Sequence, residues 1–215
     1  VEELVLQLAQ RAFQLHLFKS TIINDQHSRL IKDHVEYDLS VLVPVLLKLG
    51  TLKEPEIPIE KYIHYVKSND KELLPLVLEL VESTFTSNTK KYILPLIDPD
   101  IKPSKVAIGL FDTKFLPKDD FLLLWMESNH IWKKNISLDY CLKNEKINLL
   151  KKIDWKSIYN LNTIYNFLSK TEKLYLNRNF IDNKISIKED KNMYSILEKT
   201  DRKSTRLNSS HQIIS

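Results

Sequence analysis

Two stretches near the amino terminus decide the fold: LVLQLAQRAFQLHLF at residues 4–18 and LIKDHVEYDLSVLVPVLLKL at residues 30–49. In both stretches apolar residues recur at intervals of three and four, which is the spacing of one face of an α-helix. Two such helices with a short connection bury their apolar faces on each other. We therefore expect residues 1–52 to form a long antiparallel helical hairpin.

Polar residues and a glycine mark the expected helix ends. Asn24 and Asp25 interrupt the first pattern and can cap the second helix, and Gly50 follows the last apolar position of that helix. Asp70 and Asn129 can cap helices later in the chain. The same spacing predicts further helices at residues 59–66, 71–85, 89–97, 118–126, 131–142 and 155–168.

The composition favours the same all-α class. Only 2 of the 215 residues are glycine, whereas average usage of about 7% would give roughly fifteen, which disfavours tight β-hairpins and glycine-rich phosphate loops. Residues 53–58 (KEPEIP) form a linker because each proline restricts the residue before it. The short antiparallel helix pairs that follow predict a HEAT-like α-solenoid over residues 53–169, with a compact irregular bundle as the alternative. Residues 170–200 are expected to be a loop and a linker helix.

Three segments carry a resemblance to a known family. Residues 72–99 (ELLPLVLELVESTFTSNTKKYILPLIDP) resemble the region after the membrane domain in bacterial major-facilitator-type nucleotide-exchange (ATP/ADP-translocase-like) transporters that carry HEAT repeats. Residues 117–143 resemble one further HEAT repeat, with Trp132 in the aromatic position at the start of its second helix. Residues 193–199 (MYSILEK) resemble the segment that precedes a cyclic nucleotide-binding domain in such proteins.

The resemblance implies partners rather than a reaction. It implies a transmembrane transporter domain upstream and a cyclic nucleotide-binding domain downstream in the same chain, or else contact with another protein. Its motifs are patterns of Leu, Pro and Trp, so it assigns no catalytic, cofactor-binding or metal-binding residue. We also expect Trp132 to anchor a core between consecutive helix pairs.

The charge pattern disfavours a nucleic-acid partner. The formal net charge is +4, and half of it comes from the last fifteen residues, so the body of the chain is close to neutral. The longest uncharged apolar run, residues 39–47, is far shorter than the roughly 18 residues of a membrane span. We therefore expect no direct membrane span in this fragment, which begins at Val1 without a signal peptide and is interpreted as part of something longer.

The carboxyl terminus changes character abruptly at residues 201–215 (DRKSTRLNSSHQIIS). Ser, Arg and His replace the preceding Ile, Lys and Asn. We interpret this tail as non-native, a translated cloning or sequencing-adaptor artefact. A native disordered terminus is the alternative.

The single cysteine and the histidines offer weak chemistry. Cys141 lies beside Tyr140 and Leu142 in an apolar helix pattern, where a buried, inert thiol is expected rather than a nucleophile. His27 and His34 are seven residues apart and would share a helix face. No nearby Cys or third His completes a tetrahedral metal site, so no metal is predicted.

Acidic pairs and aromatic residues have structural explanations as well. Asp98 with Asp100, and Asp119 with Asp120, fit turns and helix N-termini better than acid/base catalysis. The aromatic and lysine residues at 151–167 could stack bases, but their helical spacing favours a packed face.

We therefore predict that the chain is not an enzyme and needs no cofactor. The predicted function is a non-catalytic, HEAT-like scaffold or interaction segment of a larger membrane transporter-like protein, on the cytoplasmic side of the membrane. The alternative is a free-standing soluble helical-repeat module that binds other proteins.

Overall fold

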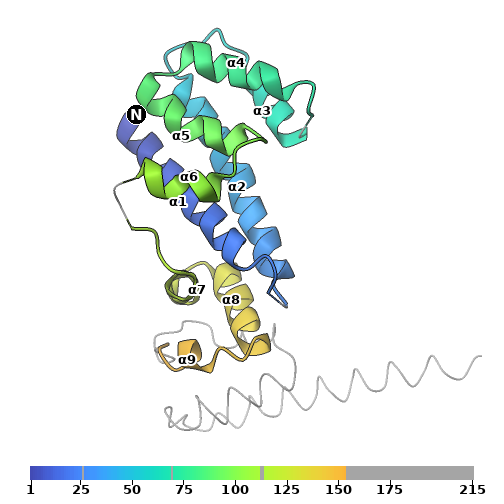
Figure 1. Ribbon diagram of the computed structural model, residues 1–215, viewed down its shortest axis with the longest axis vertical. Coiled ribbons are helices and arrows are strands. Elements are labelled where there is room, and N and C mark those ends of the chain that lie inside the picture. Colours follow the sequence, from blue (N-terminus) through green and yellow to red (C-terminus); the bar gives the residue numbers. More distant parts are fainter. Residues whose placement is uncertain (26, 69, 112–113, 154–215) are drawn as a thin grey trace, which may run out of the picture. The chain divides into compact units, whose positions relative to one another are not determined.

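The computed structural model describes residues 1–153 apart from residues 26, 69 and 112–113, and all regular structure in this part is helical (Figure 1). The predicted all-α class is confirmed. The expected helix at 155–168, the segment 170–200 and the tail 201–215 lie outside the described residues. The helices are α1 (Glu2–Thr21), α2 (Arg29–Gly50), α3 (Ile59–Ser68), α4 (Leu74–Thr84), α5 (Ser87–Ile97), α6 (Pro103–Leu110), α7 (Lys118–Glu127), α8 (Ile131–Lys143) and α9 (Ile147–Leu150).

Helices α1 and α2 form the predicted hairpin. They lie side by side and pack against each other more extensively than any other pair of described helices (Figure 1). Ala9 and Phe13 of α1, and Val35 and Leu46 of α2, are fully buried. Pro44 lies inside α2, which nevertheless continues to its predicted end.

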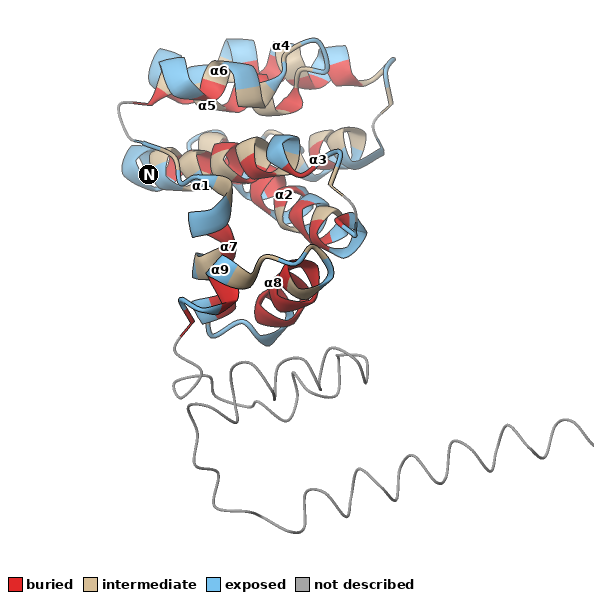
Figure 2. Ribbon diagram, turned by 60° about the horizontal axis from the view of Figure 1, so that its bottom comes forward, coloured by how far each residue is buried: buried red, intermediate tan, exposed pale blue. Residues whose placement is uncertain are grey.

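Helices α3 to α6 cover the end of the hairpin formed by the start of α1 and the end of α2. Contacts run from α3 to α4, from α4 to α5 and from α5 to α6, and both α5 and α6 contact α1. Figure 2 shows α4, α5 and α6 as a layer over α1, α2 and α3. Val81, Ile93 and Phe111 from these segments join Phe13 and Leu46 in one apolar core. The stacking of helix pairs into a solenoid stays a prediction.

The last residue of α2 is glycine for a steric reason. No glycine in the described chain has positive φ, so the backbone freedom of glycine is not used here. A Cβ atom built on Gly50 would lie 2.2 Å from Cε2 of Phe85, whose side chain belongs to the core. Gly50 lies at the end of the helix, as expected. A glycine is needed there because the Phe85 ring leaves no room for a Cβ atom.

Helices α7 and α8 pack at the other end of the hairpin. The ring of Phe18 in α1 lies 4.7 Å from Phe121 and 5.6 Å from Trp125, centroid to centroid. Trp125 is 4% exposed, whereas Trp132 is 45% exposed. The prediction that Trp132 anchors the core is wrong, because Trp132 lies in the first turn of α8, ahead of the buried segment 133–141. Trp125 shares a helix face with Phe121 and takes the anchoring role.

Several predicted caps differ from the observed ones. Leu73, not Asp70, is the N-cap of α4, and His130, not Asn129, is the N-cap of α8. Asp25 does not cap α2, which begins without a side-chain cap. Near a helix start several polar residues are equally suited by type, and the backbone turn that precedes the helix selects among them.

Most other element predictions agree with the structure. The linker at 53–58 contains no helix, and α3, α5, α7 and α8 begin within two residues of their predicted starts. Helix α6 was not expected: it begins with Pro103 and buries only Ala107, so its apolar face is too weak to reveal it. None of the described helices combines the length and apolar character that a bilayer crossing requires.

Candidate functional site

An ion pair joins α2 to α8 at the centre of the candidate site. Lys133 donates from Nζ to Oδ2 of Asp38 at 2.5 Å, and the two side chains are only 10% and 12% exposed. The same ammonium lies 5.2 Å from the centroid of the Trp125 ring, in cation–π geometry. Because both charges are largely buried, each depends on the other for its compensation.

His34 lies one turn before Asp38 on α2 and is buried against the same residues. Its ring centroid is 5.4 Å from that of Trp125 and 5.7 Å from that of His130. Its Nε2 lies 3.7 Å from Oδ1 of Asp38, which is too far for a hydrogen bond, and this nitrogen has no hydrogen-bond partner in the described part of the chain. Burial lowers the pKa of His34; Asp38 opposes this, while Lys133 and His130 lower the pKa further. His34 is therefore neutral at pH 7.

His130 starts α8 and lies at the surface. Its Nδ1 accepts a hydrogen bond from the backbone N–H of Lys133 at 3.4 Å, which makes His130 the side-chain cap of the helix. In the neutral ring the proton then resides on Nε2. The cap therefore uses Nδ1 of His130 and leaves Nε2 as the donor atom of the neutral ring.

A cavity of about 560 Å³ lies beside this ion pair, with walls from α1, α2, α7 and the start of α8. Leu15, Phe121 and Trp125 supply buried apolar surface, and Asp38 and Lys133 supply charged surface. The other lining residues are Arg11, Gln14, Leu116, Leu124, Glu127, Ser128, Asn129 and His130. The site thus combines an apolar base with several polar groups near its rim.

The side chain of Gln14 fixes one edge of the cavity. Its Nε2 donates to the carbonyl oxygen of Leu116 at 3.0 Å, and its Oε1 accepts from the N–H of Leu116 at 2.7 Å. One amide thus satisfies both backbone groups of a residue 102 positions away. We call this pair of hydrogen bonds the Gln14 clamp; it fastens the segment before α7 to α1.

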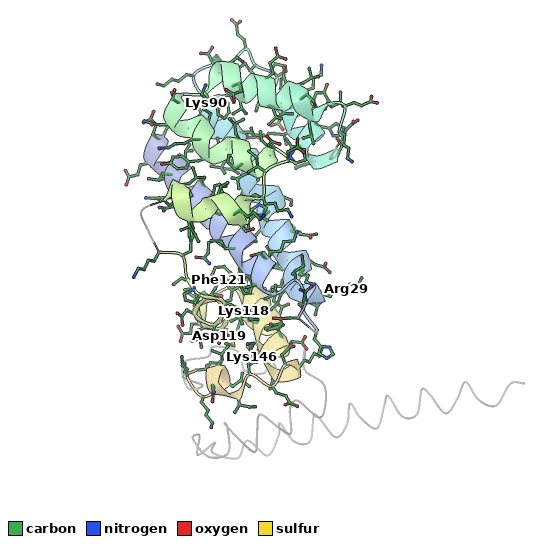
Figure 3. The ribbon with its side chains drawn as sticks, in the orientation of Figure 1. Arg29, Lys90, Lys118, Asp119, Phe121 and Lys146 are labelled. Carbon is green, nitrogen blue, oxygen red and sulfur yellow. The ribbon has the colours of Figure 1, made fainter. Side chains whose placement is uncertain are left out.

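A second polar cluster lies at the connection between α1 and α2. Asp25 accepts hydrogen bonds from Nζ of Lys118 at 2.6 Å and from the hydroxyl of Tyr140. Lys146 donates to Asp119 at 3.3 Å, and Figure 3 shows Lys118, Asp119 and Lys146 close together. Each of these five side chains has its partner within the cluster. The cluster therefore ties the α1–α2 connection to α7 and α8 and offers no free group to a ligand.

Hydrogen bonding in this cluster shifts two pKa values in opposite directions. Burial raises the pKa of Asp25, but the bonds from Lys118 and Tyr140 outweigh burial and lower it overall. Burial, followed by the bond to Asp25, raises the pKa of Tyr140. Asp25 is therefore held as a carboxylate and Tyr140 as a neutral phenol at pH 7.

The residues that the sequence offered for nucleophilic or metal chemistry have structural roles or lie outside the candidate site. The expectation that Cys141 is buried is confirmed, and burial raises the pKa of its thiol to about 12, which disfavours the thiolate form. His27 precedes α2 with a φ of 58°, so the expectation that it shares a helix face with His34 is wrong. The cause is the left-handed turn at His27, which ends before the helix begins.

The acidic pairs occupy turns and a helix start, as expected. Asp98 accepts from the backbone N–H of Asp100 at 2.9 Å, which closes a local turn. Asp119 and Asp120 lie in the first turn of α7, where carboxylates favour the helix dipole. The aromatic and lysine residues at 154–167 lie outside the described residues.

At the level of sequence, His34 was considered only as a metal ligand together with His27, and Asp38 and Lys133 were not identified. His34 and Asp38 are four residues apart and stand on the apolar stripe of α2, next to Ile31 and Leu42. Polar residues within an otherwise apolar stripe are the signal that could have identified them. Their partner Lys133, 95 residues away from Asp38, has no such signal.

Neither a metal site nor a comparison with known proteins assigns a function to this chain. Within the described residues no group of three or more His, Cys, Asp or Glu side chains could hold a metal ion. No protein-family model, curated protein or solved structure matches the chain. The class defined by the structure is an all-α protein, and the transporter-associated HEAT family stays a prediction.

Proposed function

We propose that this chain is a non-catalytic, HEAT-like helical scaffold that makes protein–protein contacts within a larger membrane transporter-like protein, on the cytoplasmic side of the membrane. Two features support a scaffold. Consecutive helices from α3 to α6 contact their neighbours in chain order, as helices in repeat proteins do. The polar clusters at Asp25 and at Lys133 use their charges to join helices.

The observation that carries the proposal is the exposed apolar face of α2. Leu30, Tyr37, Val41 and Val45 are 39%, 63%, 46% and 37% exposed, and their spacing of seven, four and four places them on one side of the helix. We call these four residues the α2 stripe. Scattered exposed apolar residues are ordinary, but an aligned set along one helix is typical of an interaction surface.

Photo-crosslinking tests the proposal in cells that carry the native gene. A benzophenone amino acid at Tyr37 should cross-link to a defined peptide, identified by mass spectrometry. The matched control is the same amino acid at Glu79, an exposed position on α4, which should give no cross-link. Val41→Glu should suppress the Tyr37 cross-link, because a carboxylate in the α2 stripe opposes apolar contact.

The identity of the cross-linked peptide separates the two candidate contexts. A peptide from a membrane-spanning domain of the same polypeptide supports the transporter-like protein. A peptide from a separate protein supports the free-standing helical module instead. Absence of any cross-link at Tyr37, or equal cross-linking at Glu79, would overturn the contact through the α2 stripe, which is the observation that carries the proposed function.

A further inference from the structure

We infer that the cavity beside the Lys133–Asp38 pair binds a short peptide segment of a partner protein, in which a bulky apolar side chain neighbours a carboxylate. This inference rests on the proposed interaction function and names the chemistry of one contact. The cavity lies apart from the α2 stripe: no stripe residue lines it.

The apolar part of the segment is specified by the base and rim of the cavity. Leu15, Phe121 and Trp125 are buried residues that line it. Leu116 and Leu124 also line it and are 43% and 51% exposed. A volume of about 560 Å³ accommodates an aromatic or branched side chain, and covering the two leucines removes further apolar surface from water.

Arg11 is the residue that would bind the carboxylate of the segment. This residue stands one turn before Leu15 on α1, is exposed, and has no ion-pair partner among the described residues. Lys133 does not compete for an incoming anion because Asp38 already neutralises it at 2.5 Å. A guanidinium binds a carboxylate with two parallel hydrogen bonds, and His130, whose neutral ring donates from Nε2, lines the same cavity.

Glu127 limits the segment to a single carboxylate. It is exposed at the end of α7 and lines the same cavity. Its carboxylate can accept an N–H from the backbone of a bound segment, whereas a second acidic side chain beside it would be repelled. The lining therefore favours one acidic and one apolar residue rather than an acidic run.

The open form of the cavity favours a peptide over a free small molecule. Small-molecule sites enclose most of their ligand, whereas this cavity leaves Leu116 and Leu124 half exposed at its rim. A protein segment brings flanking chain that covers such a rim. The occupant that fits is therefore part of a larger partner.

Three blocked dipeptides test the inference by two-dimensional NMR titration, with the indole N–H of Trp125 as reporter: N-acetyl-Phe-Glu-amide, N-acetyl-Phe-Gln-amide and N-acetyl-Ala-Glu-amide. The first should produce a saturable shift. The second lacks the charge and the third lacks the apolar side chain. Each should bind at least about tenfold more weakly, which is the effect of losing one charge-assisted or apolar contact.

Two exposed lining residues of opposite charge provide matched variants. Arg11→Gln should weaken binding of the Phe-Glu dipeptide by about tenfold and abolish its advantage over the Phe-Gln dipeptide. Glu127→Gln should leave binding unchanged or strengthen it. Equal binding of all three dipeptides, no saturable shift at about 10 mM, or loss of binding in Glu127→Gln but not in Arg11→Gln would overturn the inference.

Failure of this inference is distinguishable from failure of the proposed function. Arg11→Gln leaves the α2 stripe intact, so the Tyr37 cross-link should persist in that variant. A Tyr37 cross-link without dipeptide binding would refute the cavity and keep the scaffold. Dipeptide binding without a Tyr37 cross-link would refute the contact through the α2 stripe and keep the cavity.

Discussion

The two ends of the α1–α2 hairpin are stabilised by different interactions. Where α3 to α6 pack, the core cluster consists of apolar side chains, among them Phe13, Leu46 and Phe85. Where α7 and α8 pack, aromatic contacts are combined with two polar links, the Lys133–Asp38 pair and the bonds from Lys118 and Tyr140 to Asp25. One hairpin thus joins an end with an apolar core, where the Lys48–Glu60 ion pair between α2 and α3 is exposed, to an end with a buried ion pair.

These different interactions predict how the stability of each end responds to substitution and to pH. Removing apolar side-chain volume from a core lowers the free energy of unfolding roughly in proportion to the cavity left, and this loss does not depend on pH. A buried ion pair depends on both partners, so removing one leaves an uncompensated charge. The mixed end is therefore expected to be more sensitive to charge and to acid, and the core of the apolar end to size.

The largest expected effect concerns the aromatic anchor of the mixed end. Trp125→Ala removes a side chain that is 4% exposed and contacts Phe18 and Phe121, so it should lower the free energy of unfolding by about 3–5 kcal/mol. Trp132→Ala, at 45% exposure, should cost less than about 1.5 kcal/mol. Urea denaturation of both variants measures this. Equal losses would show that the first turn of α8 is covered in solution.

The next effect separates the charged link from the packing around it. Lys133→Met leaves the Asp38 carboxylate buried without its partner and should cost about 2–4 kcal/mol of unfolding free energy. The double variant Lys133→Met, Asp38→Leu should recover most of that loss. The control is Lys90→Met, because the Lys90–Glu82 pair is more exposed and should contribute less than about 1 kcal/mol. If the double variant is no more stable than the single one, the ion pair is not the reason for the loss.

At the apolar end, two glycines should respond with opposite signs. Gly50→Ala forces a Cβ atom against the Phe85 ring and should destabilise the protein by about 1–3 kcal/mol. Gly109→Ala in α6 meets nothing within 4 Å and should stabilise the protein by up to about 1 kcal/mol, because alanine favours the helix. Thermal or urea unfolding compares them. A stabilising Gly50→Ala would mean that the Phe85 ring moves aside without loss.

The smallest effect is the response to acid. Burial, followed by the charge of Lys19, lowers the pKa of His16 to about 4, and burial lowers the pKa of His34. The folded protein then binds fewer protons than the unfolded chain below about pH 6.5, so stability falls as pH falls through that value. We expect a loss of about 1–2 kcal/mol between pH 7 and pH 5.

The double variant His16→Leu, His34→Leu identifies the source of this acid response. It removes both titrating rings, so its urea midpoint should change less between pH 7 and pH 5 than that of the native chain. A native midpoint that is constant or rises toward pH 5 would contradict the assigned directions of both pKa shifts.

Local periodicity was sufficient to predict the elements with strong apolar faces. The stripes of α1 and α2 bury Leu15 and Leu46 at the expected spacing, although Leu4 at the start of α1 is 46% exposed, and Pro117 lies immediately before α7 as expected. Short helices with little buried surface gave no such signal: α6 buries only Ala107. The aromatic anchor was assigned to Trp132 because residue type alone does not distinguish a covered turn from an open one.

The candidate site could not be predicted because its contacts join distant parts of the chain. Lys133 and Asp38 are 95 residues apart, and Tyr140 and Asp25 are 115 apart. Asp25 was expected to cap a helix by its residue type, but the long-range bonds from Lys118 and Tyr140 hold it instead. Local sequence specifies which side chains are suited to a role, and the tertiary fold selects the role that each one takes.

The Gln14 clamp also sets a tolerance for changes in chain length. Since Leu116 is held to α1 through both of its backbone groups, the length of chain between Leu116 and Lys118 sets where α7 begins relative to α1. Residues inserted between Leu116 and Lys118 would displace the start of α7 and carry Lys118 away from Asp25. The clamp therefore fixes the register of α7 against α1, and the Lys118–Asp25 bond depends on the number of residues that separate Lys118 from Leu116.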